Sequence, residues 1–256
     1  MPMRRVQVFD VNETLLDLAA LDPQFERIFG DAGVRRAWFN QMIQSALVST
    51  VTGTYRQFGA VAMAALAMVA EQAGVQLAEE DRDAVAAQLR RLPAHPEVPE
   101  ALERLRGAGF RLAALTNSTE EVARAQLEHA GIIGAFEQVL SADTVRRLKP
   151  APEPYRLAAE RLGVTVGEVR LVAAHAWDLA GATAAGCATA FVARPGKVLD
   201  PWSRPRTWSA PTWARSPTGS SPPTADRRAA AWMAVLRTCV RRPDKSEAMS
   251  ETWPWR

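Results

Sequence analysis

The stretch Val8-Phe9-Asp10-Val11-Asn12-Glu13-Thr14-Leu15-Leu16-Asp17 decides the fold of this chain. It continues a short apolar run, residues 5–9, that ends in a carboxylate. A strand buried on both faces of a parallel sheet has such a run, and its last side chain lies at the carboxyl edge of the sheet. We therefore expect a buried N-terminal strand that delivers Asp10 to that edge.

Helical periodicity follows, almost without interruption, from residue 21 to about residue 92. Val85 and Leu89, four residues apart, are typical of one face of a helix. Pro93 and Pro96 end the block, because proline cannot continue a helix. The pattern predicts a helical unit inserted after the first strand.

Beyond residue 98, helices and strands alternate, and glycines follow the helices. The predicted helices cover residues 98–108, 119–130, 153–162 and 178–185. The predicted strands cover residues 111–115, 138–140, 169–173 and 188–193. This alternation predicts an α/β protein with an open, Rossmann-like parallel sheet as its core.

Composition excludes several classes of protein. The 256 residues are 48% hydrophobic, enough for one core with an inserted unit. Residues 201–256 hold 10 Lys/Arg and 4 Asp/Glu, a net charge of +6, whereas the rest holds 21 and 24, a net of −3. Because a nucleic-acid-binding protein needs a basic face on its folded part, we expect no nucleic-acid partner.

Other features of the sequence predict a soluble, cytoplasmic protein. We expect no signal peptide, because only four residues separate Arg5 from Asp10, and no membrane span, because the longest apolar stretch is residues 61–70. Cys187 and Cys239 form no disulfide framework and fit a reducing compartment. Residues 199–256 hold six of the eight tryptophans among Ser, Pro and Arg. We interpret this tail as disordered, out of frame or newly acquired; the alternative is a docked proline-rich extension.

Candidate catalytic residues fall at or just after the predicted strand ends. They are Asp10, Thr116, Lys149 and the segment 175–178. In an open parallel sheet the ligand lies beyond the carboxyl ends of the strands, so these residues are expected to meet. A carboxylate nucleophile there needs hydrogen-bond donors, a nearby cation and a group that positions water, and this set supplies each.

These motifs resemble the four motifs of the haloacid dehalogenase superfamily. They are Asp10 to Thr14, Leu115-Thr116-Asn117, Lys149-Pro150 with Tyr155, and His175-Ala176-Trp177-Asp178. The helical insertion and the Ala-Trp-Asp run are similar to type II 2-haloacid dehalogenases in particular. The resemblance implies a core of residues 1–14 and 93–198 with a helical cap of residues 15–92.

The resemblance also implies a reaction and a set of roles. Asp10 would displace halide from C2 of a small anionic 2-haloacid, and water would then cleave the resulting ester to release a 2-hydroxy acid. The implied catalytic residues are Asp10, Thr14, Lys149, His175 and Asp178. The implied substrate-binding residues are Val11, Asn12, Phe39, Thr116, Asn117, Tyr155 and Trp177. No metal or cofactor is implied, and because relatives often dimerise through the cap, a homodimer is expected.

Asn12 favours a dehalogenase over a magnesium-dependent phosphatase of the same superfamily. Such phosphatases carry a second Asp two residues after the nucleophile as general acid, and an amide cannot donate that proton. Asn12 also removes one negative charge that would favour magnesium. Phosphatase chemistry is therefore the less favoured alternative, and a catalytically impaired homologue is a third.

Two departures alter the expected halide site. Type II dehalogenases have a cap arginine where Phe39 stands, and an Asn commonly occupies the position of His175. Because His175 can hydrogen-bond a small, strongly hydrated anion, the sequence favours defluorination of substrates such as fluoroacetate. Glu13 also departs from the usual Gly, and we expect it to be a solvent-facing loop residue.

Overall fold

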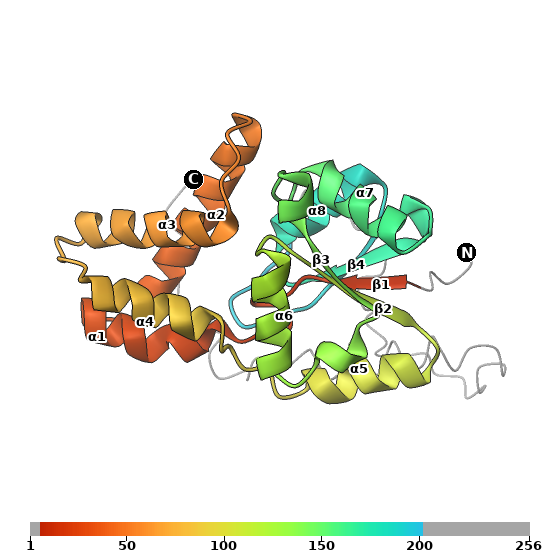
Figure 1. Ribbon diagram of the computed structural model, residues 1–256, viewed down its shortest axis with the longest axis horizontal. Coiled ribbons are helices and arrows are strands. Elements are labelled where there is room, and N and C mark those ends of the chain that lie inside the picture. Colours follow the sequence, from red (N-terminus) through yellow and green to blue (C-terminus); the bar gives the residue numbers. More distant parts are fainter. Residues whose placement is uncertain (1–5, 202–256) are drawn as a thin grey trace, which may run out of the picture.

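One parallel sheet forms the centre of the part of the chain that the computed structural model describes, residues 6–201. Its strands are β1 (Val6–Phe9), β2 (Arg111–Thr116), β3 (Gln138–Ser141), β4 (Val169–Ala173) and β5 (Ala188–Phe191). Their order is β3-β2-β1-β4-β5, so β1 is central and pairs in parallel with both β2 and β4 (Figure 1). The chain changes direction across the sheet between β1 and β4, which is where α/β sheets open a ligand crevice.

Helices cover both faces of this sheet. Helices α5 (Val98–Gly107) and α6 (Glu120–His129) lie on one face, and α7 (Pro152–Arg161) and α8 (Ala176–Ala185) on the other (Figure 1). Short 3₁₀ turns occur at η2 (Ile133–Ala135), η3 (Ala142–Val145) and η4 (Val166–Glu168). Successive side chains of β1 alternate, so Val8 packs toward α7 and α8 whereas Phe9 packs in the other cluster. The predicted α/β class and Rossmann-like core are confirmed.

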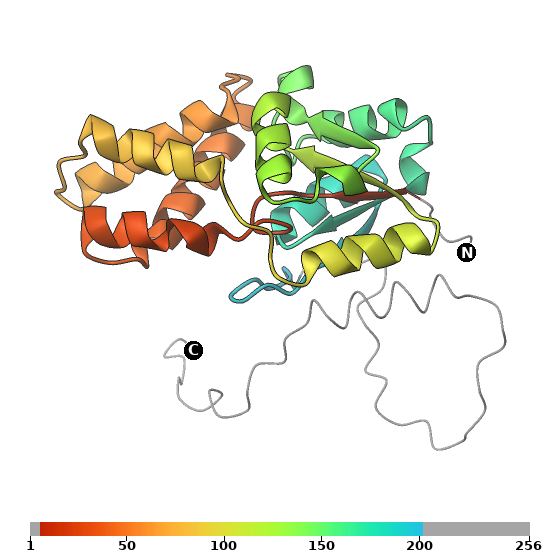
Figure 2. The same cartoon turned by 60° about the horizontal axis from the view of Figure 1, so that its bottom comes forward.

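Four further helices follow β1 and stand beside the sheet (Figures 1 and 2). They are α1 (Asp22–Phe29), α2 (Val34–Val51), α3 (Phe58–Gln72) and α4 (Glu79–Leu89), preceded by the 3₁₀ turn η1 (Leu18–Leu21). We call α1–α4 the cap helices. The prediction of nearly continuous helix missed the turns between them, where Gly30, Gly53 and Gly74 adopt left-handed backbone angles.

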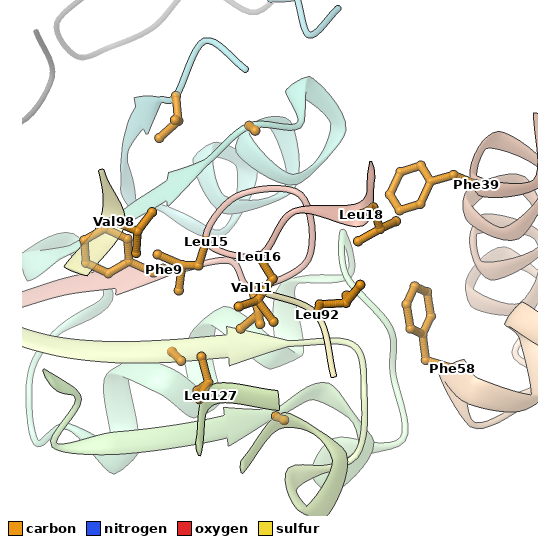
Figure 3. Packing of buried hydrophobic residues seen from close by; sticks show 14 of the residues in the cluster. Phe9, Val11, Leu15, Leu16, Leu18, Phe39, Phe58, Leu92, Val98 and Leu127 are labelled. Carbon is orange, nitrogen blue, oxygen red and sulfur yellow. The ribbon is translucent and has the colours of Figure 1, made fainter. Parts of the chain in front are cut away.

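A buried aromatic junction joins the cap helices to the core. Trp38 on α2 is fully buried and donates its indole N–H to the Ala62 carbonyl on α3, 2.9 Å away. Figure 3 shows Phe39 and Phe58 reaching from the cap helices toward Leu18 beside the core. This junction positions one aromatic wall of the cap over the end of β1.

Several predictions on the rest of the chain remain predictions. Residues 202–256 lie outside the described part, so the interpretation of the tail is an expectation only. Within residues 6–201, every helix is too short or too polar to cross a membrane. The homodimer, the cytoplasmic location and the domain boundaries likewise remain predictions from the sequence.

Candidate active site

Asp10 follows the last residue of the central strand, and its carboxylate is buried and held on both oxygens. Lys149 Nζ donates to Oδ1 at 2.7 Å, and the Thr14 hydroxyl donates to Oδ2 at 2.6 Å. The Thr14 oxygen in turn accepts the Ala174 backbone N–H at 3.0 Å. Because Ala174 directly follows β4, two neighbouring strands fix this carboxylate.

Lys149 lies between two carboxylates and is almost inaccessible to solvent, at 1% exposure. Its ammonium also donates to Asp178 Oδ2 at 2.7 Å and to the Leu115 carbonyl at 3.1 Å. Its backbone N–H donates to Asn117 Oδ1 at 2.8 Å. All three donor positions of the ammonium are therefore used, and the side chain cannot swing away.

The two carboxylates beside Lys149 have opposite pKa shifts. Burial alone would raise the pKa of Asp10, but the charge of Lys149 and the hydrogen bond from His175 outweigh it and lower the pKa below 3.8. For Asp178, burial outweighs the charge of Lys149, and the nearby charge of Asp10 adds to burial, so the pKa is raised. When two environments push two pKa values apart, the pair divides its roles. Asp10 is therefore the one of the two carboxylates that the site keeps ionised.

Tyr155 holds Asp178 and does not face the cavity beside Asp10. Its hydroxyl donates to Asp178 Oδ1 at 2.6 Å, and its ring is buried between α7 and the sheet. From the sequence, a substrate contact was expected for this residue. The structure instead gives the hydroxyl a partner within the protein, and through Asp178 and Lys149 it reaches Asp10.

His175 lies between two carboxylates and two aromatic rings. Its Nδ1 is 3.3 Å from Asp10 Oδ2, and its Nε2 is 2.9 Å from Glu13 Oε2. Its ring stacks between Phe39 and Trp177, with centroids 5.4 and 5.3 Å away. Burial lowers the pKa of His175, but the hydrogen bonds and charges of Asp10 and Glu13 outweigh it and raise the pKa above 6.5.

A small cavity opens directly above Asp10. Its volume is about 10 Å³, close to the minimum for a single water molecule. A wider cleft of about 680 Å³ lies beside it between the cap helices and α6. Both cavities are bordered by Asn12, Phe39 and Phe58. The small cavity is lined by Asp10, Asn12, Phe39, Ile43, Phe58, Thr116, Asn117, Lys149, His175 and Trp177.

Most of the residues predicted for the site therefore meet around this cavity. Thr14 and Asp178 lie one contact behind it. Val11 does not reach it, because its side chain is fully buried in the hydrophobic core. The Thr116 hydroxyl accepts the Ser118 backbone N–H at 3.2 Å, which stabilises the turn after β2.

The sequence did not predict the contacts of three charged residues, Glu13, Lys197 and Arg194. Glu13 was expected to face solvent, but it is directed toward His175 and also accepts from Lys197 at 2.5 Å. Arg194 donates to the Thr14 carbonyl at 2.7 and 3.1 Å, which fixes the loop after β1. The one available signal was the pair Asn12-Glu13, which departs from both branches of the superfamily.

Comparison with known sequences places the chain in a family. Residues 5–186 match the sequence model of the haloacid dehalogenase-like hydrolases. That match covers well over half of the chain and includes Asp10, Lys149 and Asp178 of the site just described. The chain belongs to the haloacid dehalogenase-like hydrolases.

Its similar relatives include named dehalogenases. The chain is 30% identical over 194 residues to (S)-2-haloacid dehalogenase 4A of Burkholderia cepacia, a match covering 75% of this chain and 84% of the relative. It is 28% identical over 202 residues to haloacetate dehalogenase H-2 of Moraxella sp. (strain B), covering 77% and 90%. The solved L-2-haloacid dehalogenase of Xanthobacter autotrophicus, with chloropropionic acid covalently bound, is 30% identical at a TM-score of 0.70, covering 75% and 78%.

Proposed function

We propose that this chain hydrolyses small 2-haloalkanoic acids to 2-hydroxy acids through an ester on Asp10. The observation that carries this proposal is the Asp10 carboxylate, buried yet ionised, at the base of a small cavity that Phe39, Phe58 and Trp177 help to line. Its lysine and threonine donors leave it oriented rather than free to rotate. The covalently bound chloropropionic acid in the relative from Xanthobacter autotrophicus supports a covalent route.

The reaction has two displacements. In the first, an Asp10 oxygen attacks C2 from the side opposite the halogen, the carbon–oxygen bond forms, and halide leaves with inversion. Asn117 lines the cavity, and its oxygen accepts from the Lys149 N–H, so its amide NH₂ is the end available to hold the substrate carboxylate. In the second step, water attacks the carboxyl carbon of Asp10 and the 2-hydroxy acid leaves.

Phe39, His175 and Trp177 form the side of the cavity that would contact the halogen. Phe39 stands where the resemblance to type II dehalogenases places a cap arginine, so this wall offers an aromatic ring and no guanidinium. His175, with its raised pKa, supplies a positive charge between Phe39 and Trp177 instead. A compact cavity beside an imidazolium suits fluoride, the smallest and most strongly hydrated halide. We therefore include fluoroacetate among the proposed substrates.

The phosphatase alternative fits these residues poorly. Magnesium prefers several oxygen ligands in octahedral geometry. Here both Asp10 oxygens already accept from Lys149, Thr14 and His175, two of which are cationic. The Asn12 oxygen accepts the Gln126 amide at 3.3 Å. These donors and charges oppose a divalent cation next to Asp10.

Substrate hydrolysis and intact mass together test the proposal. The purified chain is incubated with chloroacetate, 2-chloropropanoate and fluoroacetate, and free halide and protein mass are followed. We expect halide release without added magnesium and a transient adduct that Asp10→Asn abolishes. Halide release that depends on magnesium, or phosphatase activity that Asn12→Asp raises strongly, would favour the alternative. No adduct and no halide with any haloacid would favour the impaired homologue.

Chloride and fluoride release separate the two parts of the proposal. Release of both ions supports the full substrate range. Chloride release without fluoride release would rule out defluorination and leave the proposed dehalogenase activity intact.

We also propose that residues 15–92 act as a cap, because the cavity next to Asp10 must widen to admit a molecule larger than water.

A further inference from the structure

Glu13, His175 and Asp10 form a continuous string of side chains. Glu13 Oε2 lies 2.9 Å from His175 Nε2, and His175 Nδ1 lies 3.3 Å from Asp10 Oδ2. Asp10 and Glu13 come from the loop after β1, and His175 is the residue directly before α8. A carboxylate, an imidazole and a reacting group in this order are the arrangement by which an oriented histidine acts as a general base.

Glu13 is held in place for this contact. Its backbone is left-handed, with φ of 60°, a conformation that favours glycine over a residue with a side chain. Its carboxylate is ion-paired with Lys197 at 2.5 Å, and Arg35 lies 3.8 Å away. Burial raises the pKa of Glu13, but His175 and Lys197 outweigh it and lower the pKa below 4.5. The unusual backbone therefore places an ionised carboxylate on the histidine.

The partner of Nε2 decides what Nδ1 can do. An ionised Glu13 can only accept, so Nε2 carries the proton in this contact. In the neutral imidazole the other nitrogen is then the acceptor, and Nδ1 is the nitrogen that faces Asp10. The stacking of the ring between Phe39 and Trp177 keeps its plane fixed.

We propose that Glu13 and His175 are the pair that activates water for hydrolysis of the Asp10 ester. This inference rests on the proposed function and assigns its second step. His175 Nδ1 takes one proton from water while the oxygen bonds to the Asp10 carboxyl carbon. The tetrahedral intermediate breaks its bond to the product oxygen, and the second water proton passes from the new carboxyl group to that oxygen. Asp10 returns as carboxylate and His175 as imidazolium.

Formation of the ester itself changes the charge around His175. In the free enzyme Asp10 and Glu13 both raise the pKa of His175. Esterification removes the negative charge of Asp10, so Glu13 is the one carboxylate still in contact with His175. The positive charges of Lys149, next to Asp10, and Lys197, next to Glu13, remain. The pKa of His175 falls and its proton goes to solvent. One proton, one halide and one hydroxy acid are thus released for each haloacid and water consumed.

The first and second steps then need His175 in different protonation states. As imidazolium it adds positive charge to the cavity while halide departs. As neutral imidazole it serves as the base. Arg35 and Asp178 are the further charged groups, one beside Glu13 and one beside Lys149, and neither contacts the imidazole directly.

Rapid-quench kinetics on the full chain test the pair. The variants are His175→Gln and Glu13→Gln, with His129→Gln and Glu128→Gln on the exposed surface of α6 as matched controls. With 2-chloropropanoate, His175→Gln should release about one chloride per site and then stall as the ester, with ester hydrolysis slowed about 10²- to 10⁴-fold. Glu13→Gln should slow the same step about tenfold or more, and its pH profile should shift to lower pH. Both controls should behave as wild type.

Glu13→Gly separates catalysis from loop shape. Glycine suits a φ of 60°, so this variant keeps the loop while it removes the carboxylate. We expect Glu13→Gly to accumulate ester as Glu13→Gln does. Its free energy of unfolding should be no lower than that of Glu13→Gln. Ester hydrolysis at the wild-type rate in Glu13→Gly or in His175→Gln would overturn the inference while leaving the dehalogenase intact. If wild type forms no ester and releases no halide, the proposed function itself fails.

Discussion

Gly181 on α8 has no room for a side chain, because the helix packs directly on Pro150. A β-carbon at this position would lie 2.5 Å from the Pro150 carbonyl oxygen and 2.8 Å from its α-carbon. Ordinary contacts between such atoms are about 3.5 Å, so Gly181→Ala must displace the Pro150 backbone by roughly 1 Å. Pro150 directly follows Lys149, whose ammonium holds both Asp10 and Asp178. The strain should therefore reach Asp10, the proposed nucleophile.

Two magnitudes follow from this geometry. Overpacking of a dense core costs about 1–3 kcal/mol, which lowers the melting temperature by roughly 2–12 °C in a chain of this size. A displacement of about 1 Å in a catalytic group can lower turnover roughly 10²-fold. We expect Gly181→Ala to show both effects.

Calorimetry and steady-state halide release measure these effects on one preparation. Gly107→Ala is the matched control, because nothing lies within 4 Å of the β-carbon it would add and the site is exposed. The control should keep full activity and melt no more than a degree or two away from wild type. If Gly181→Ala also melts and turns over like wild type, α8 does not position Lys149 in the way described.

Three further predictions concern the groups around the nucleophile. Tyr155→Phe removes the donor to Asp178 and should lower kcat about tenfold or more with little change in KM, whereas a substrate contact would mainly raise KM. Arg194→Met frees the Thr14 carbonyl and should cost about 1–3 kcal/mol of stability, measured by urea unfolding. Because the pKa of Asp10 is lowered below 3.8, the first-turnover halide burst should hold its amplitude from about pH 7 down to about pH 5. A burst that halves near pH 5 would contradict this assignment of the ionised carboxylate.

The fold was predictable because its signals are local. A short apolar run before Asp10, glycines after helices and proline at residue 93 are properties of neighbouring residues. These signals predicted the parallel sheet, the helical insertion and the contact between Asp10 and Lys149. The turns between the cap helices were missed because Gly30, Gly53 and Gly74 interrupt a pattern whose apolar spacing continues.

The finer parts of the site depend on contacts between distant residues. Glu13 and Lys197 form an ion pair although 184 positions separate them in the sequence, and no local sequence pattern predicts that pair. Tyr155 was expected at the substrate because its motif has that spacing, yet its hydroxyl is used by Asp178. The resemblance implied a substrate contact for Val11, but alternation along an extended chain directs its side chain to the core.

A single turnover in ¹⁸O-labelled water tests the central claim most directly. With enzyme in excess over 2-chloropropanoate, the reaction is quenched, the protein is digested, and the peptide containing Asp10 is sequenced by mass spectrometry. Hydrolysis of an Asp10 ester places the label in the Asp10 carboxylate and leaves the first-turnover product unlabelled. Label found only in the 2-hydroxy acid would mean that water attacks the substrate directly, and Asp10 would not be the nucleophile.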